Sequence, residues 1–339
     1  MASFVMLASG IVFCSCSDDG SETDGPRLMG FAVTVNDVST RGTLVTDDEG
    51  SSPLTRLAVT ALFDNGSGSQ QHYFDNLTVA RDGAGSPWSY SPAYYWPGVV
   101  SASNPMTFVA YAPLATDGNG LTVTPGTGAT TPTIQYVTPT TLADQSDLLF
   151  AQTTAYKTNE AVNLPFNHIL TSHRFVVGST MEAGLQIRSI TFSHIQTGGT
   201  YAKGTSGYAW ELATTYENRS HGDTTDEPEE VTYLYKSTGD EEEGTNILGT
   251  ECFILLPQTL TTDAKLIIDA YYEDAPLDAS KTHIALADLC STWAAGKTYT
   301  YTITYSGPDT GIQVSVEETN AFISDWKNGE STNHNNFNW

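Results

Sequence analysis

The sequence predicts an all-β protein, and three observations support this fold class. Only 16% of the 339 residues are charged, while Thr, Tyr, Val, Gly and Ser are abundant, which favours strands joined by tight turns over surface helices. Apolar residues recur with a period of two in many short runs. Turn-forming residues separate these runs, and short strands punctuated in this way are typical of β-sandwiches.

The first segment is a predicted export signal. An apolar run over residues 4–13 is too short to span a bilayer, and it ends in Cys14-Ser15-Cys16, directly before an acidic stretch. Residues 1–16 are therefore predicted to be a lipoprotein signal peptide that ends at a lipidated Cys16. No Lys or Arg precedes the apolar run, which a start codon assigned too late would explain. The alternative is a hydrophobic N-terminus with a chance cysteine.

Residues 17–26 are polar and acidic, which predicts a flexible tether between lipid and folded body. No later run approaches the roughly 20 apolar residues of a spanning helix, so attachment to a membrane would come from the lipid. Several acyl chains on one cysteine, palmitate among them, would hold the protein more firmly than one.

The folded part begins with a strand predicted over residues 28–40. Met29, Phe31, Val33 and Val35 alternate with smaller or polar neighbours. Further strands are predicted at residues 57–63, 106–111, 174–177, 187–192, 252–256, 266–272, 299–305 and 312–316. Between them lie turn sequences such as Asp64-Asn65-Gly66, Asp82-Gly83 and Ser306-Gly307-Pro308-Asp309.

Chain length predicts two domains. We assign residues 27–160 to an N-terminal β-sandwich domain, residues 161–329 to a C-terminal β-sandwich domain, and residues 330–339 to a polar tail. Residues 122–141, rich in Thr, Pro and Gly, are predicted to be a long loop near the end of the first domain. Residues 218–244 carry nine acidic side chains and are interpreted as a solvated loop or hairpin tip, not a metal site.

Charge and motifs exclude several function classes. With 39 acidic and 14 basic residues, the formal charge of −25 would repel nucleic-acid phosphates, so no nucleic-acid partner is predicted. The sequence contains no GxSxG, HExxH, CxxC, complete phosphate loop or GxGxxG, so we predict no enzyme, no catalytic residue, no metal and no cofactor. His168 and His173 are five residues apart and would face opposite sides of a strand, and His168 is interpreted as buried and hydrogen-bonded.

Cys252 and Cys290 are the two cysteines outside the signal. An exported location permits a disulfide between them, and two buried thiols are the alternative.

Several short motifs follow one another along the chain: Trp88-Ser-Tyr90, Tyr94-Tyr95-Trp96-Pro97, Phe108-Val-Ala110-Tyr111-Ala112-Pro113, Asp147-Leu-Leu-Phe150-Ala151, Leu164-x-Phe166-x-His168-x-Leu170, Leu256-Pro257-Gln258, Trp293-x-Ala295-Gly296-Lys297-x-Tyr299-x-Tyr301 and Trp326-x-x-Gly329. In this order and spacing they resemble the Bacteroidales fimbrillin family of pilus and pilus-like surface lipoproteins. The resemblance implies two stacked transthyretin-like sandwich domains, display on the cell outer membrane, and assembly into fimbriae or a role at their tip or base. Asp18 and Asp19 resemble the surface-export signal of such lipoproteins.

The resemblance also implies a mechanism of assembly. The first strand would fold into the subunit's own sheet until a protease cuts the following loop, and a strand of another fimbrial subunit would then fill the groove by β-augmentation. Arg41 directly follows the predicted strand and is the candidate cleavage site; its alternative is an ordinary exposed loop arginine.

The end of the chain is a poor donor strand, because residues 327–339 are dominated by Asn, Ser, Thr, Gly and charge. This favours a tip or accessory subunit over a repeating stalk subunit. The alternative function is a stand-alone surface lipoprotein that binds a glycan or a host protein through loops. For Tyr94-Tyr95-Trp96-Pro97 we favour packing at a core edge over a sugar-stacking platform.

Overall fold

The computed structural model describes residues 25–35, 54–83, 85–116, 118–224, 232–249 and 251–320. Strands dominate these residues, and the one α-helix among them is the four-residue α1 (Leu286–Leu289). The all-β fold class predicted from the sequence is confirmed, and each of the eight strands predicted after the first overlaps an observed strand. None of the described helices is long and apolar enough to cross a membrane.

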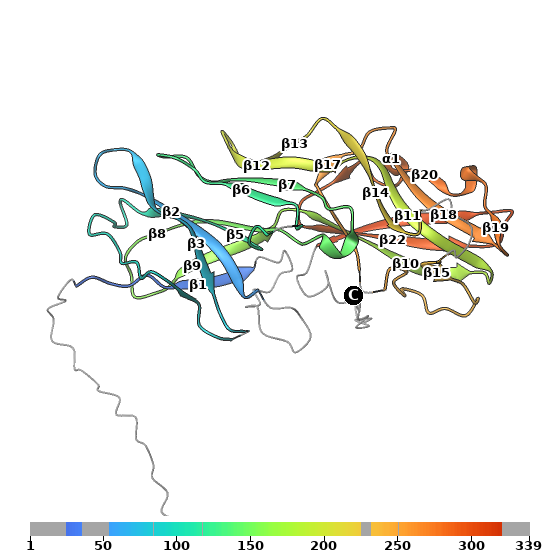
Figure 1. The fold of residues 1–339 in the computed structure, drawn as a ribbon, viewed down its shortest axis with the longest axis horizontal. Helices are drawn as coiled ribbons and strands as arrows, with labels where there is room; N and C mark the ends of the chain where they lie inside the picture. The colour runs from blue at the N-terminus through green and yellow to red at the C-terminus, as the bar shows by residue number, and fades with distance from the viewer. Residues whose placement is uncertain are drawn as a thin grey trace, which may run out of the picture.

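The strands form two packed groups of sheets along the long axis of the molecule (Figure 1). In chain order they are β1 (Phe31–Val35), β2 (Arg56–Asp64), β3 (Gln70–Ala80), β4 (Ser89–Tyr90), β5 (Met106–Ala112), β6 (Leu121–Thr124), β7 (Thr133–Val137), β8 (Leu149–Ala155), β9 (Val162–His168), β10 (Thr171–Met181), β11 (Leu185–Gln196), β12 (Gly198–Gly204), β13 (Gly207–Leu212), β14 (Tyr216–Gly222), β15 (Tyr235–Lys236), β16 (Phe253–Leu255), β17 (Gln258–Thr259), β18 (Lys265–Tyr272), β19 (Ala275–Pro276), β20 (His283–Ala285), β21 (Thr292–Trp293), β22 (Lys297–Tyr305) and β23 (Ile312–Asn320).

The first group is built on a seven-stranded sheet with the order β1-β9-β8-β5-β2-β3-β4. Its central strand β5 is buried along its whole length, because alternate side chains enter two different cores. Phe108 and Ala110 belong to one core, and Val109 and Tyr111 belong to the other. A continuous apolar run is the expected pattern for a strand that is covered on both faces.

A four-stranded sheet, β13-β12-β7-β6, covers one face of the seven-stranded sheet (Figure 1). Its strands β6 and β7 form a hairpin over residues 121–137, so the prediction of a long loop over residues 122–141 is wrong. The physical reason is that apolar residues alternate with polar ones in both strands. Leu121 and Val123 of β6, and Ile134 and Tyr136 of β7, pack on the core between the sheets.

The second group has a core between the sheet β16-β10-β22-β23 and the sheet β14-β11-β18-β19. Its centre is aromatic, because the rings of Phe175 and Phe192 lie 5.7 Å apart and each lies 5.0–6.1 Å from the rings of Phe253 and Tyr301. At the sheet edge, β23 pairs with β22 over nine residues, from Tyr305 opposite Ile312 to Lys297 opposite Asn320.

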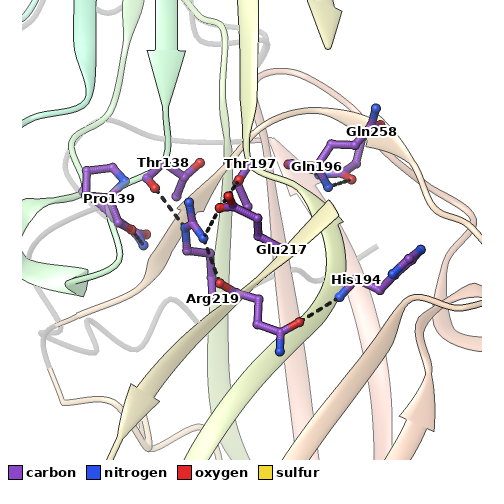
Figure 2. A network of polar contacts seen from close by, with 10 residues as sticks. Thr138, Pro139, His194, Gln196, Thr197, Glu217, Arg219 and Gln258 are labelled. Carbon is purple, nitrogen blue, oxygen red and sulfur yellow. Dashed lines mark hydrogen bonds and ion pairs between the residues drawn. The ribbon is translucent and has the colours of Figure 1, made fainter. Parts of the chain in front are cut away.

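A polar network ties the two groups together (Figure 2). The Thr138 amide donates to the Thr197 carbonyl at 2.7 Å, and Arg219 Nε donates to the Thr138 carbonyl at 2.9 Å. Glu217 accepts from Arg219 at 2.9 Å and from the Thr197 hydroxyl at 2.8 Å, and these bonds lower the pKa of its carboxyl group. The end of β7 is thereby fixed to β14 and to the turn between β11 and β12.

Pairing between strands also joins the two halves of the chain. β9 lies in the seven-stranded sheet, and the hairpin β12–β13 pairs with β7, although both follow residue 160. The division into domains at 27–160 and 161–329 stays a prediction.

Candidate functional site

The candidate site is the sheet edge that residues 27–35 occupy. β1 runs parallel to β9, from Phe31 opposite Val162 to Val35 opposite Phe166. The Val162 amide donates to the Gly30 carbonyl at 2.8 Å. As predicted, the first strand lies in a sheet with its own chain's strands. The described part of this strand ends at Val35, and residues 36–40 lie outside the described residues.

The backbone of β9 forms one wall of the site, and residues 94–96 form a second wall beside the start of the segment. The Met29 amide donates to the Tyr94 carbonyl at 3.0 Å, and the Trp96 amide donates to the Arg27 carbonyl at 2.9 Å. Leu28 and Tyr95 are direct antiparallel partners. The segment is therefore held first by residues 94–96 and then by β9.

The floor beneath the segment is apolar and aromatic. Met29 is 1% exposed and Phe31 is 7% exposed. The Phe31 ring lies 5.4 Å from the ring of Tyr90 and 6.1 Å from that of Phe108, both edge to face. Val33 and Val35 are half-buried against the same core. The alternation seen in the sequence thus turns the large side chains of β1 toward this floor and the intervening side chains toward the surface.

Two tyrosine hydroxyls fix this arrangement from the sides. Tyr90 Oη donates to the Met29 carbonyl at 2.6 Å and lies 3.3 Å from the Tyr94 carbonyl. Tyr73 Oη donates to the Tyr95 carbonyl at 2.6 Å. Burial raises the pKa of Tyr90, so its hydroxyl keeps the proton that it donates. Departure of residues 27–35 would uncover the backbone edge of β9, residues 94–96 and an aromatic floor.

The predicted lipidation and cleavage residues lie outside the part that the structure describes. This holds for Cys16, Asp18, Asp19 and Arg41, and also for the motif Trp326-x-x-Gly329 and the tail at 330–339.

The cysteines of the predicted pair lie in separate cores. Cys252 is buried near Ile254 and Leu256, whereas Cys290 is half-buried against the core of the second group. In the structure Cys252 is a buried thiol and Cys290 is a half-buried one.

The two histidines have separate structural partners. His168 is buried with Nδ1 at 2.6 Å from Asp147 Oδ2, so its interpretation as a buried, hydrogen-bonded histidine is confirmed. His173 lies between Thr171 and Tyr301, in a different core. Across the described residues, no group of three or more His, Cys, Asp or Glu side chains could hold a metal ion.

Tyr94 and Trp96 pack at a core edge, as the sequence predicted, since Trp96 is 7% exposed and Tyr94 packs against the same core, whereas Tyr95 is exposed. Sequence reasoning missed the contacts of Tyr73, because β3 was not predicted. The signal for β3 is weak since a bulge interrupts its alternation near Asn76, whose φ is +48°.

Comparison with known proteins agrees with this architecture. A family model described as fimbrillin-like matches residues 40–326. A crystal structure of a fimbrial protein from Bacteroides vulgatus is 18% identical, with a TM-score of 0.57, covering 87% of this chain and 99% of that one. Candidate cell adhesion proteins from Bacteroides uniformis and Bacteroides ovatus are 19% and 17% identical, with TM-scores of 0.52 and 0.53. They are covered to 100% and 98%, and they cover 91% and 89% of this chain. At these identities the structures show a shared fold. No curated protein matches the sequence.

Proposed function

The chain belongs to the fimbrillin-like family, and from this premise we propose that it is a structural or adhesive subunit of a cell-surface fimbria, assembled by exchange of β1. The observation that carries the proposal is the position of β1. It is an edge strand, paired with β9 on one side, and its large side chains cover an apolar core. A strand of another fimbrial subunit that replaced it would find both backbone partners and side-chain pockets.

The distribution of basic residues supports a single cut after β1. Arg41 is the only Lys or Arg in residues 36–55, and the next basic residue, Arg56, already begins β2 opposite Ala80. A protease specific for basic residues would therefore have one target between β1 and β2. Cleavage there would separate the segment from Cys16 to Arg41 from the rest of the chain.

The lipid anchor belongs to the uncut form. We propose that Cys16 carries the lipid, that Asp18 and Asp19 direct export, and that the precursor is held at the cell outer membrane. In this proposal these residues provide membrane attachment and the export signal, while the groove accepts the strand of another subunit.

A tip or accessory position is favoured because this chain offers no spare strand among its described residues. β23 is the last described strand, and its pairing with β22 extends over nine residues, with Ile312 buried at its start. Donating β23 would break that ladder. The chain is therefore proposed to accept a strand more readily than to give one.

An arginine-specific protease tests the mechanism. We expect a cut after Arg41 by mass spectrometry, followed by uptake of a fluorescent peptide with the sequence of residues 27–35. Arg41→Ala should resist this cut and exclude the peptide, whereas Arg56→Ala, the matched control, should behave like the parent. A peptide with Ser at the positions of Met29 and Phe31 should not enter, because it cannot fill the apolar floor.

Two outcomes would reject strand exchange. One is cleavage after Arg41 without peptide uptake, even with excess peptide. The other is nicking at scattered sites with no cut after Arg41. Either result would favour the alternative of a stand-alone surface lipoprotein that binds a glycan or host protein.

A further inference from the structure

Exposed apolar side chains gather at one end of the molecule. Among the described residues, six large hydrophobic side chains are exposed, and four of them lie at one end of the seven-stranded sheet: Leu28, Tyr95, Val99 and Tyr156, at 53%, 46%, 47% and 43%. The register defines this end, because β1 and β9 start there, β8 ends there and β5 starts there. It is also the end at which residue 28 leads back toward the predicted tether.

Three of these residues form what we call the tether-end patch: Leu28, Tyr95 and Val99. Leu28 and Tyr95 are cross-strand partners, so their side chains are neighbours on the surface. The backbone beneath Val99 is fixed, since Asn104 Nδ2 donates to the Val99 carbonyl at 3.2 Å and to the Asp64 carbonyl at 2.9 Å.

Charge is distributed unevenly along the molecule. The loops at the tether end, residues 27–30, 64–69, 94–105 and 156–161, hold two basic and two acidic residues, so their formal charge is +2 − 2 = 0. The loops at the other end, residues 182–184, 237–244, 273–274 and 306–311, hold eight acidic residues and no basic one. Strands β18 and β19 lie at that far end, opposite β1 (Figure 1).

A lipid surface matches this polarity. A tyrosine ring with apolar neighbours is suited to a membrane–water interface, and the neutral end is the one that an anionic lipid surface would repel least. Residues 17–26 can span at most about 35 Å when fully extended. A lipid on Cys16 would therefore keep the patch close to the bilayer.

We propose that the tether-end patch rests on the lipid bilayer, so that the uncut protein stands on the membrane with its acidic end outward. This inference rests on the lipid anchor of the proposed function. The cut after Arg41 would remove Leu28 together with the anchor, and so would release both attachments at once.

Partition into vesicles tests the patch. The chain from Cys16 to Trp339, with Cys290→Ser to prevent side reactions, would be coupled through Cys16 to one maleimide-bearing acyl chain, because a single chain binds bilayers only marginally. We expect the patch variant Leu28→Thr/Tyr95→Thr/Val99→Thr to bind phosphatidylcholine vesicles with an affinity about tenfold lower than that of the parent, or lower still. The control Val137→Thr/Tyr216→Thr changes exposed residues elsewhere and should bind like the parent. Equal thermal unfolding of all variants would show that each is folded.

Three results would overturn the proposal. The patch variant could bind like the parent, or the control could lose as much binding as the patch variant. Thirdly, the parent could self-associate in the absence of vesicles, and only the patch variant could lose this self-association. That result would identify the patch as a contact between copies of the chain instead. Chemical coupling keeps this test separate from natural lipidation, because mass spectrometry of the membrane-extracted protein would reveal an unmodified Cys16 independently.

Discussion

His173 is a titratable side chain that is fully buried. The Thr171 hydroxyl donates to the Leu255 carbonyl at 3.0 Å, so it accepts at 2.9 Å from a proton on His173 Nε2. Nδ1 then remains an acceptor and faces Tyr301 Oη at 3.4 Å. Burial lowers the pKa of His173 well below its usual value, which agrees with a neutral ring in the folded protein.

This burial predicts acid sensitivity. The unfolded chain binds a proton on His173 near pH 6.5 and the folded chain does not, so the free energy of unfolding falls as pH decreases below about 6.5. His173→Phe retains the stacking on Tyr299 and should reduce this fall by up to about 1.4 kcal/mol per pH unit. The measurement is urea unfolding at several pH values, with the exposed His283→Gln as control. An unchanged pH dependence in His173→Phe would contradict the assignment.

Sequence reasoning at this scale succeeded where neighbours along the chain carried the signal. The alternation Leu164-x-Phe166-x-His168 predicted a buried histidine correctly. Its partner Asp147 could not be assigned, because it lies 21 residues away and is brought near by the pairing of β8 with β9.

At the scale of elements, β1 owes its attachment to a few large side chains. Phe31→Ala would leave a cavity beside Tyr90 and Phe108, and we expect the free energy of unfolding to fall by about 3 kcal/mol. The Thr34 hydroxyl donates to Asn163 at an exposed position. Thr34→Ala should therefore lower the free energy of unfolding by less than about 1 kcal/mol. Denaturant unfolding would compare the two, and hydrogen exchange should show faster exchange of β9 amides in Phe31→Ala. Equal effects of the two substitutions would mean that β1 is not anchored by its aromatic side chain.

Strands with a clear continuous or alternating run of apolar residues were predicted, whereas strands without such a run were not. β2, β5, β18 and β22 match the runs at 57–63, 106–111, 266–272 and 299–305. The hairpin β6–β7 was missed because Thr, Pro and Gly dominate its sequence, and because β7 pairs with the distant strand β12. Composition describes local preference, whereas pairing with a distant strand decides such cases.

At the scale of the whole molecule, one core is built from both halves of the chain. Tyr208 of β13 lies 4.5 Å from the ring of Phe150, and Trp210 Nε1 donates to the Ile169 carbonyl at 2.7 Å. Cys252, Ile254 and Leu256 complete the same core. Sequence patterns could not reveal this, because they do not specify which sheet a hairpin joins.

This shared core predicts that the described body unfolds as one unit. Arg219→Ala removes the bonds to the Thr138 carbonyl and to Glu217, and its effect should lower stability by about 2 kcal/mol or more. Because those bonds join the two groups of sheets, calorimetry should show a single transition that moves as a whole. The control is Arg56→Ala, at an exposed position, which should leave the midpoint nearly unchanged. Two transitions, of which only one shifts in Arg219→Ala, would show instead that the halves fold independently and that the polar network merely links them.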